Sequence, residues 1–294
     1  MKPAAFDYHT PRTVDEALGL LAQYAGDAKP LAGGQSLVPT MNFRLAQPAA
    51  LIDLNGIDEL FYLKEGEHGL RCGAMTRQRT VEHSALAQRL SPLLHEAMPH
   101  IAHTQIRNRG TIGGSLAHAD PAAELPALAL ALDARFSVRS ITDARLIPAR
   151  DFYTGLLATA MQPEEMLVDV EFPTLPPNSG WAFDEVARQH GNYALCGAAG
   201  VITLGECGMV KKAKLVFLSV GEGPVEAAQA ANALIGEHTT PDAVDAAAET
   251  AAMQEIDPVG DIHAGPTFRR HLARVLAKRV LTKAAARANA QISM

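Results

Sequence analysis

The first 55 residues alternate between one amphipathic stretch and short apolar runs. Thr13-Val14-Asp15-Glu16 has the Thr-x-x-Glu spacing of a capping box, and apolar residues follow it at helical intervals. Apolar runs at residues 29–32 and 51–54 predict buried strands, with a short helix over residues 37–45 between them. We therefore expect a small α/β unit in the order helix, strand, loop, helix, strand.

The pattern of residues 56–176 mixes strands and helices. Apolar runs flank Gly66-Glu67-His68-Gly69, which predicts a β-hairpin. Alternating residues predict strands at 135–139 and 166–172, and the Ala- and Leu-rich residues 122–132 predict a helix. Further helices are expected over residues 80–88 and 92–102.

Prolines interrupt the pattern after residue 172, and residues 174–180 have the composition of a linker. Beyond them, three strands are expected in an antiparallel meander, at residues 181–188, 200–204 and 212–220. Three helices are expected to follow, at residues 225–235, 243–254 and 266–288. The sequence predicts an α+β fold with a first domain at residues 1–176, divided at about residue 55, and a second domain at residues 177–294.

Composition narrows the function classes. The chain has 294 residues, 48% hydrophobic and 20% charged, which is enough for two ordinary domains with buried cores. A net charge of −6 without a basic block argues against nucleic-acid binding, and no apolar run is long enough for a membrane span or a signal peptide. Cys72, Cys196 and Cys207 are odd in number and form no Cys-x-x-Cys, so we expect neither disulfides nor a protein-bound iron–sulfur cluster, and a cytoplasmic setting.

Two glycine pairs are the main candidates for chemistry. Gly33-Gly34 and Gly113-Gly114 are each followed by a serine, Ser36 or Ser115. Glycine allows close approach of the backbone, and successive N–H groups in such turns form a nest that suits phosphate oxygens. Two facing nests could hold the halves of a pyrophosphate, which points to a dinucleotide. The alternative is that both pairs are only tight turns.

Two common nucleotide-binding classes are disfavoured. No Gly-x-Gly-x-x-Gly follows a predicted strand, and no Gly-Lys-Ser/Thr follows either glycine pair. Downstream of the second pair, Asp120 is expected to cap the helix that Pro121 opens. Glu124, one turn later, could accept hydrogen bonds from a bound nucleotide.

Four segments resemble one family in order and at compatible spacing. They are residues 32–54, with Ala32-Gly33-Gly34-Gln35-Ser36-Leu37, residues 107–121, with Thr111-Ile112-Gly113-Gly114-Ser115, residues 188–194, and residues 269–276. Together they are similar to the FAD-binding medium subunits of molybdenum hydroxylases, the flavoprotein subunits of the carbon monoxide dehydrogenase and xanthine dehydrogenase family. The resemblance implies a PCMH-type, vanillyl-alcohol-oxidase-like FAD domain of two α/β subdomains. A small domain with a three-stranded antiparallel sheet and a helical cluster would follow it.

The resemblance also implies a cofactor and partners. FAD would be held without a covalent bond, while molybdopterin and two [2Fe–2S] clusters would belong to a large and a small partner subunit, in a dimer of heterotrimers. The implied FAD contacts are Ala32, Gly33, Gly34, Gln35, Ser36, Leu37, Thr111, Ile112, Gly113, Gly114, Ser115, Glu124 and Tyr193. Glu124, Asn192 and Ser115 depart from the residues most common in the family pattern, and Tyr193 would lie near the isoalloxazine.

The function implied is electron transfer from the partner's clusters through FAD to an external acceptor, with no catalytic residue and no metal ligand in this chain. A stand-alone FAD oxidase and a flavin-free assembly protein are the alternatives. His95, His100 and His103 lack the spacing of a metal site, and Cys196 is either a packed thiol or a redox group near the flavin. Carbon monoxide, aldehydes, purines and N-heterocycles all stay open as substrates. The acceptor stays equally open among NAD, a quinone, a cytochrome and oxygen.

Overall fold

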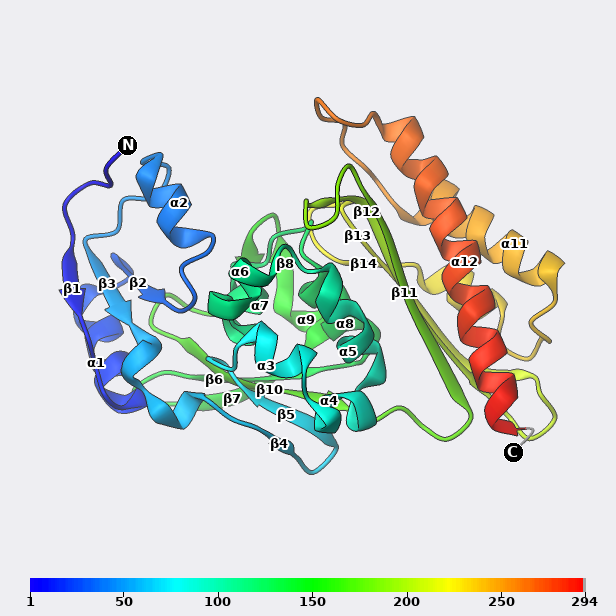
Figure 1. The fold of residues 1–294 in the computed structure, drawn as a ribbon, viewed down its shortest axis with the longest axis horizontal. Helices are drawn as coiled ribbons and strands as arrows, with labels where there is room; N and C mark the ends of the chain where they lie inside the picture. Colours follow the sequence, from blue (N-terminus) through cyan, green and yellow to red (C-terminus); the bar gives the residue numbers. More distant parts are fainter. Residues whose placement is uncertain (293–294) are drawn as a thin grey trace.

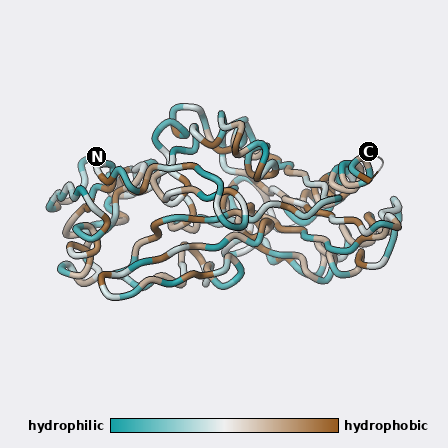
Figure 2. Tube along the Cα trace, turned by 90° about the horizontal axis from the view of Figure 1, so that it is seen from below, coloured by the Kyte–Doolittle hydropathy of each residue, from teal (hydrophilic) through white to brown (hydrophobic). Residues whose placement is uncertain are grey.

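Three sheets follow one another along the longest axis of the molecule, in the order of the chain (Figure 1). The structure is a computed structural model that describes residues 1–292. The N-terminus lies at one end of this axis and the C-terminal helix at the other. Apolar segments run through the interior along the same axis, and polar segments line the outside (Figure 2). No helix among residues 1–292 combines the length and apolar character needed to cross a membrane.

The N-terminal sheet is parallel and has the strand order β1-β3-β2. Its elements are β1 (Asp7–His9), α1 (Val14–Tyr24), β2 (Ala28–Leu31), α2 (Leu37–Asn42) and β3 (Ala50–Asp53). Thr13 caps α1 by accepting a hydrogen bond from the Glu16 N–H at 3.2 Å, as the capping box predicts. The expected α/β unit is confirmed, but strand β1 was missed because three partly exposed residues form no apolar pattern.

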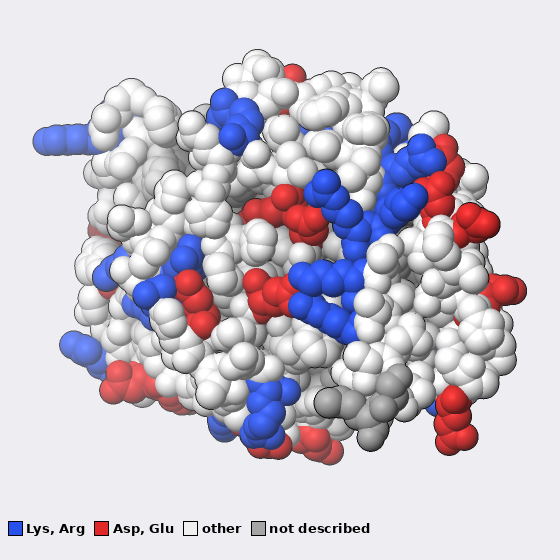
Figure 3. Space-filling model, turned by 45° about the vertical axis from the view of Figure 1, so that its right-hand side comes forward, with Lys and Arg blue, Asp and Glu red and all other residues white. Residues whose placement is uncertain are grey.

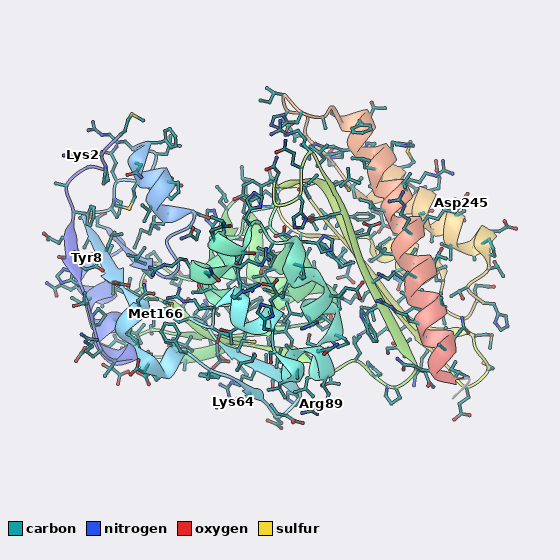
Figure 4. All side chains as sticks on the ribbon, viewed as in Figure 1. Lys2, Tyr8, Lys64, Arg89, Met166 and Asp245 are labelled. Atoms are coloured by element: carbon teal, nitrogen blue, oxygen red, sulfur yellow. The ribbon has the colours of Figure 1, made fainter. Side chains whose placement is uncertain are left out.

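The central sheet is antiparallel, in the order β4-β5-β10-β6-β7. Its strands are β4 (Leu63–Glu65), β5 (Gly69–Gly73), β6 (Arg135–Arg139), β7 (Ala144–Pro148) and β10 (Met166–Pro173). The hairpin of β4 and β5 is confirmed, and β10 enters the middle of the sheet from far along the chain. Lys64 and Arg89 lie at the outer edge of this part (Figure 4). Strand β7 was not predicted, because it is an edge strand with mostly exposed side chains.

Short helices cover one face of the central sheet (Figure 1). They are α3 (Gln78–Glu82), α4 (Ala85–Leu90), α5 (Pro92–Ala97), α6 (Thr104–Arg109), α7 (Ile112–His118), α8 (Glu124–Ala131) and α9 (Ala149–Phe152), and a small hairpin of β8 (Tyr153–Gly155) and β9 (Ala158–Thr159) follows them. The two helices expected over residues 80–102 are divided into shorter ones. The Ser84 hydroxyl caps α4, and Ser91 followed by Pro92 starts α5, so local capping breaks the longer apolar pattern.

The C-terminal sheet is antiparallel, in the order β11-β12-β13-β14. Its elements are β11 (Ser179–Ala187), β12 (Ala194–Leu204), β13 (Val210–Leu218), β14 (Val225–Glu226), α10 (Ala228–Ala233), α11 (Pro241–Thr250) and α12 (Pro266–Ile292). The predicted meander is therefore confirmed, but a fourth strand, β14, extends it. The helix expected from residue 225 is shorter and starts at Ala228, because Val225 and Glu226 pair with β13.

The C-terminal sheet is packed on both faces. Helix α12 lies on β11 and β12, and α8 lies against β12 and β13. All of β12 is consequently buried. Asp245 on α11 faces α12 and accepts a hydrogen bond from Lys278 at 2.9 Å (Figure 4).

Ion pairs join the C-terminal sheet and its helices to the central part. Glu96 of α5 binds both Lys283 and Arg287 of α12 at 2.6 Å, and Lys212 binds Asp133 at 2.7 Å. On the face shown in Figure 3, basic side chains accordingly lie beside acidic ones. Buried residues from the central part and the C-terminal sheet belong to one hydrophobic cluster, so this seam is a packed interface.

Candidate functional site

The first glycine segment connects the end of β2 to the start of α2. Gly34 has φ of +72°, a left-handed conformation that favours glycine. The loop is held by Asn55, whose side-chain amide donates to the Ala32 carbonyl at 3.0 Å. Within residues 1–292, no acceptor receives the backbone N–H groups of Gly33, Gly34, Gln35, Ser36 or Leu37. This loop is therefore a donor nest of the kind that binds phosphate.

The second glycine segment forms the first turn of α7, which follows α6 after two residues. Its backbone donors are already paired: Ile112 N–H with the Thr76 carbonyl at 2.9 Å, Gly113 N–H with Ala74 at 2.8 Å, and Gly114 N–H with Thr111 Oγ1 at 3.0 Å. The expectation of a second backbone nest is therefore wrong. Helix α6 (Thr104–Arg109) precedes the segment, and the buried Thr111 hydroxyl accepts from Gly114 N–H as the cap of α7.

The two glycine segments pack against each other. A Cβ on Gly33 would collide with the Arg109 carbonyl oxygen and lie 2.9 Å from Gly110 Cα. A Cβ on Gly114 would lie 2.6 Å from Thr111 Oγ1 and 3.2 Å from Ala32 Cβ. These glycines therefore permit loop-on-loop packing, and the two candidate segments form one site.

Tyr193 brings the C-terminal sheet to this site. It lies in the loop between β11 and β12, and its ring is 62% exposed. Asp120 and Ser36 of the first glycine segment both act on its hydroxyl. Desolvation of the hydroxyl and the negative charges of Asp120 and Glu124 raise the pKa of Tyr193. The structure thus brings Ser36, Asp120 and Tyr193 together from three separate segments.

Glu124 is the first residue of α8 and is only 6% exposed. Burial, and then the negative charge of Glu185, raise the pKa of Glu124 to about 8. Asp120 was expected to cap a helix that starts at Pro121. Helix α8 starts three residues later, at Glu124, so Asp120 is not its cap. Instead, the Asp120 carboxylate accepts from the Ala122 N–H at 2.9 Å and closes the turn that precedes α8.

A cavity of about 760 Å³ lies beside Tyr193. Its walls come from the turn before α8, the loop between β11 and β12, and the segment before α12; they include His103, Pro121, Arg188, Asn192, Asp261 and Arg269. Buried Arg269 supports one wall by donating to the carbonyls of Leu195 at 2.6 Å and Ser219 at 2.9 Å. The cavity is thus built where the central part and the C-terminal sheet meet.

Comparison with known proteins decides the family. Residues 4–175 match the FAD binding domain in molybdopterin dehydrogenase, and residues 181–284 match the CO dehydrogenase flavoprotein C-terminal domain. The chain belongs to the FAD-binding medium subunits of the molybdenum hydroxylases. It is thus a subunit of an oxidoreductase and carries an FAD-binding domain.

Relatives in this family match over nearly the whole chain. The 6-hydroxypseudooxynicotine dehydrogenase complex subunit alpha of Paenarthrobacter nicotinovorans is 43% identical over 98% of this chain and 97% of its own length. The carbon monoxide dehydrogenase medium chain of Hydrogenophaga pseudoflava is 37% identical, over 98% and 99% respectively. The fold agrees with solved structures of carbon monoxide dehydrogenase from H. pseudoflava (TM-score 0.94, 38% identity, covering 98% of this chain and 99% of that chain). Quinoline 2-oxidoreductase from Pseudomonas putida 86 is also similar (TM-score 0.92, 37% identity, with the same coverage).

The site of this medium subunit includes residues that motif reasoning missed. His103, which lacks the spacing of a metal ligand, occupies the N-cap position of α6, and its ring packs against Gly191 and lines the cavity. Arg188 and Arg269 lie inside segments that resemble the family, so the resemblance could have identified them as site residues. No local sequence pattern pointed to Glu185, because its charge acts on Glu124 only after β11 has packed beside the central helices.

Cys196 was the one thiol with a possible redox role. Cys196 is fully buried, and burial raises the pKa of its thiol to about 12, so a thiolate is disfavoured at neutral pH. The packed-thiol interpretation is therefore the one that fits. Among residues 1–292, no three or more His, Cys, Asp or Glu side chains are grouped to hold a metal ion.

Proposed function

We propose that this chain is the FAD-carrying electron-transfer subunit of a molybdenum hydroxylase. Electrons arrive from [2Fe–2S] clusters of a partner subunit and leave to an external acceptor. The observation that carries the proposal is the loop after β2, with unpaired N–H groups, packed against Arg109, Gly110 and Gly114 at the second segment. Bound FAD supplies a ring that accepts two electrons and passes them on, while the protein orients it and sets its electrostatic surroundings.

We propose distinct roles for the candidate FAD contacts. Unpaired N–H groups of the first segment hold the pyrophosphate, and the Thr111 and Ser115 hydroxyls donate from the opposite side. Tyr193 lies beside the flavin ring, with Glu124 at its polar edge. Ala32, Gly33 and Gly114 lie where the two segments meet, and their close packing shapes the site. Gly113 packs against Ala74, and Ile112 is buried beside it, so both hold the second segment in place. No side chain of this subunit acts as nucleophile or general base.

The partners are proposed from the same family. A small subunit with [2Fe–2S] clusters and a large subunit with molybdopterin would complete the enzyme, as a dimer of heterotrimers in the cytoplasm. The relatives' names, a medium chain and a complex subunit, support a heteromeric enzyme over a stand-alone FAD oxidase. We also propose that residues 1–176 and 177–294 are the two domains, and that the substrate pocket lies in a partner.

Anaerobic reduction of the assembled complex tests this function. Substrate should bleach the flavin absorbance of the complex, and the flavin should be released into the supernatant by acid precipitation. A complex reconstituted without this subunit should still reduce its iron–sulfur clusters but transfer no electrons to the acceptor. Flavin retained in the acid pellet would favour the stand-alone oxidase. Absence of flavin after reconstitution with FAD and the partner chains would overturn the proposal.

A further inference from the structure

A hydrogen-bonded path runs from the first glycine segment to the second through Asn55 and Arg77. The Asn55 side-chain amide donates to the Ala32 carbonyl at 3.0 Å, and its oxygen accepts from Arg77 Nη2 at 2.5 Å. Arg77 Nη1 donates in turn to the carbonyl of Arg109, just before the second segment. The backbone of Gly33 lies against this same carbonyl. The path therefore joins the two segments at the point where they pack together.

The amide of Asn55 suits this path because it both donates and accepts hydrogen bonds. Its NH₂ group donates to Asp53 Oδ1 at 2.5 Å as well as to Ala32, and its oxygen is left to accept from Arg77. Asp53 ends β3 and also accepts from the Asn55 backbone N–H at 3.0 Å, which fixes the direction of the Asn55 side chain. The first glycine segment is thus connected to Arg77 through a side chain that is itself held in place.

The backbone and the guanidinium of Arg77 are both fixed by their neighbours. Arg77 occupies the N-cap position of α3, and its backbone pairs with Thr111 in an isolated antiparallel bridge. Its guanidinium lies over the ring of Phe61, 5.4 Å from the ring centroid. Because a guanidinium is planar and carries its donors in fixed directions, it can bind Asn55 and the Arg109 carbonyl at one set spacing. A lysine has a single nitrogen and cannot span the two acceptors in this way.

The surroundings of Arg77 do little to stabilise its charge. Neither of its hydrogen-bond acceptors is a carboxylate, and the residue is half-buried. Burial, and then the positive charge of Arg109, lower the pKa of Arg77 against an opposing effect of Asp53. Replacing a charge in such a place with an apolar side chain of similar length is often neutral for stability. We therefore expect Arg77 to matter more for the position of the two segments than for folding.

We propose that Arg77, oriented by Asn55, is a positioning residue that sets the spacing of the two glycine segments for FAD. The first segment carries the unpaired N–H groups, and the path holds it against the second segment, whose N–H groups are already paired. Groups that are held at the spacing of their ligand before it binds lose less conformational entropy on binding, which raises affinity. This inference rests on the proposed function, because it assigns a role at the same FAD site to two residues outside both glycine segments.

FAD titration of the assembled complex, stripped of its flavin, tests the role of Arg77. Arg77→Met and Arg77→Lys should each weaken FAD binding by about tenfold or more, while the urea midpoint of the full chain stays close to that of wild type. Arg79→Lys is the matched control, because Arg79 lies on the same helix and forms a partly exposed ion pair with Glu82 at 3.1 Å. It should bind FAD as wild type does. Wild-type affinity in both Arg77 variants, or a urea midpoint that falls together with the affinity, would overturn the inference.

Chemical rescue separates positioning from a general effect on folding. In Arg77→Ala, free guanidinium far below denaturing concentrations should restore FAD affinity in a saturable way, because it can occupy the place of the lost side chain and bind both acceptors. Methylammonium, which has one nitrogen, should not restore it. Equal responses to the two cations would contradict the proposal, because a fixed pair of donors would then not be needed.

A double substitution tests whether Asn55 and Arg77 act on one path. Asn55→Ala should weaken FAD binding about as much as Arg77→Met, and the double variant should bind FAD no more weakly than either single variant. Additive losses would show two independent contributions and would overturn the path. Wild-type affinity in all of these variants would contradict this inference alone, whereas a wild-type complex that binds no FAD would contradict the proposed function.

Discussion

The backbone of Gly33 lies directly against that of Arg109, far along the chain, so that a Cβ on Gly33 would collide with the Arg109 carbonyl oxygen. This contact joins the loop that has unpaired N–H groups to the helix before the second glycine segment. The first loop therefore depends on the second segment for its position. Substitutions that separate the two segments should lower FAD affinity even where no atom touches the cofactor.

Gly33→Ala tests this dependence. The added methyl should push the two backbones apart, destabilise the protein by about 1–3 kcal/mol and weaken FAD binding at least tenfold. Gly19→Ala is the control, because nothing lies within 4 Å of a Cβ there and the residue is inside helix α1. Urea unfolding and fluorescence titration with FAD give the two quantities. Unchanged FAD affinity in Gly33→Ala would show that the contact does not shape the site.

Thr111 should matter both for helix α7 and for FAD. Thr111→Val removes the hydroxyl that accepts from Gly114 N–H, which should cost about 1 kcal/mol of stability. It also removes a donor proposed to face the pyrophosphate, so FAD affinity should decrease. Thr111→Ser keeps the hydroxyl and should restore both properties. If Thr111→Val lowers the free energy of unfolding but leaves FAD binding intact, the hydroxyl is only a cap.

Gly114→Val should remove FAD for a reason that only the structure supplies. Its side chain would meet Thr111 Oγ1 and Ala32 Cβ, break the cap and separate the two segments. We expect no flavin in the purified protein and a clear loss of thermal stability. Full flavin occupancy in this variant would show that the second segment takes no part in the site.

Tyr193→Phe should affect FAD more than folding. The ring is exposed, so loss of the hydroxyl should change the free energy of unfolding little. The hydroxyl, however, interacts with Asp120 and with Ser36 of the first loop, and its loss should weaken FAD binding by about 0.5–1.5 kcal/mol, or two- to tenfold. Calorimetry of FAD binding to both proteins measures the difference. Equal affinities would mean that the hydroxyl does not orient the first loop.

Glu124 should make stability depend on pH in an unusual direction. Its folded-state pKa of about 8 lies above the ordinary value of 4.5, so the folded protein binds the proton more tightly than the unfolded chain does. This contribution is present at low pH and is lost as pH rises from the unfolded value through about 8. Relative to Glu124→Gln, wild type should lose at most about 1.4 kcal/mol per pH unit in that window. Urea unfolding of both proteins from pH 5 to 8 measures this; parallel curves would contradict the assignment.

Arg269 should be a structural requirement of the cavity wall. Arg269→Met leaves the carbonyls of Leu195 and Ser219 unpaired, and should lower the free energy of unfolding by about 3 kcal/mol. Arg279→Met on the same helix is the control. Its guanidinium is exposed and forms a solvent-accessible ion pair with Asp184 at 3.4 Å. Its effect should stay within about 0.5 kcal/mol. Equal effects of the two substitutions would show that burial of Arg269 does not matter.

Local sequence patterns predicted the elements whose caps, turns or alternation lie within a few neighbouring residues. The Thr13 cap, the hairpin around Gly66-Glu67-His68-Gly69 and the meander after residue 178 are each specified by neighbouring residues. Elements without such signals were missed. Strand β1 is short and partly exposed, β7 lies at an edge, and β14 consists of two residues that pair only because β13 is already in place.

The sequence by itself determined the family, the α+β class and the two glycine segments, because these depend on residue type, order and spacing. Only the tertiary structure decided that the first segment keeps its N–H groups free while the second pairs its own with Thr76, Ala74 and Thr111. It also decided that the charge of Glu185 acts on buried Glu124 and that Gly33 meets Arg109. The physical reason is that these contacts join residues far apart in the chain, and packing of the sheets and helices, which no local pattern encodes, sets their distances.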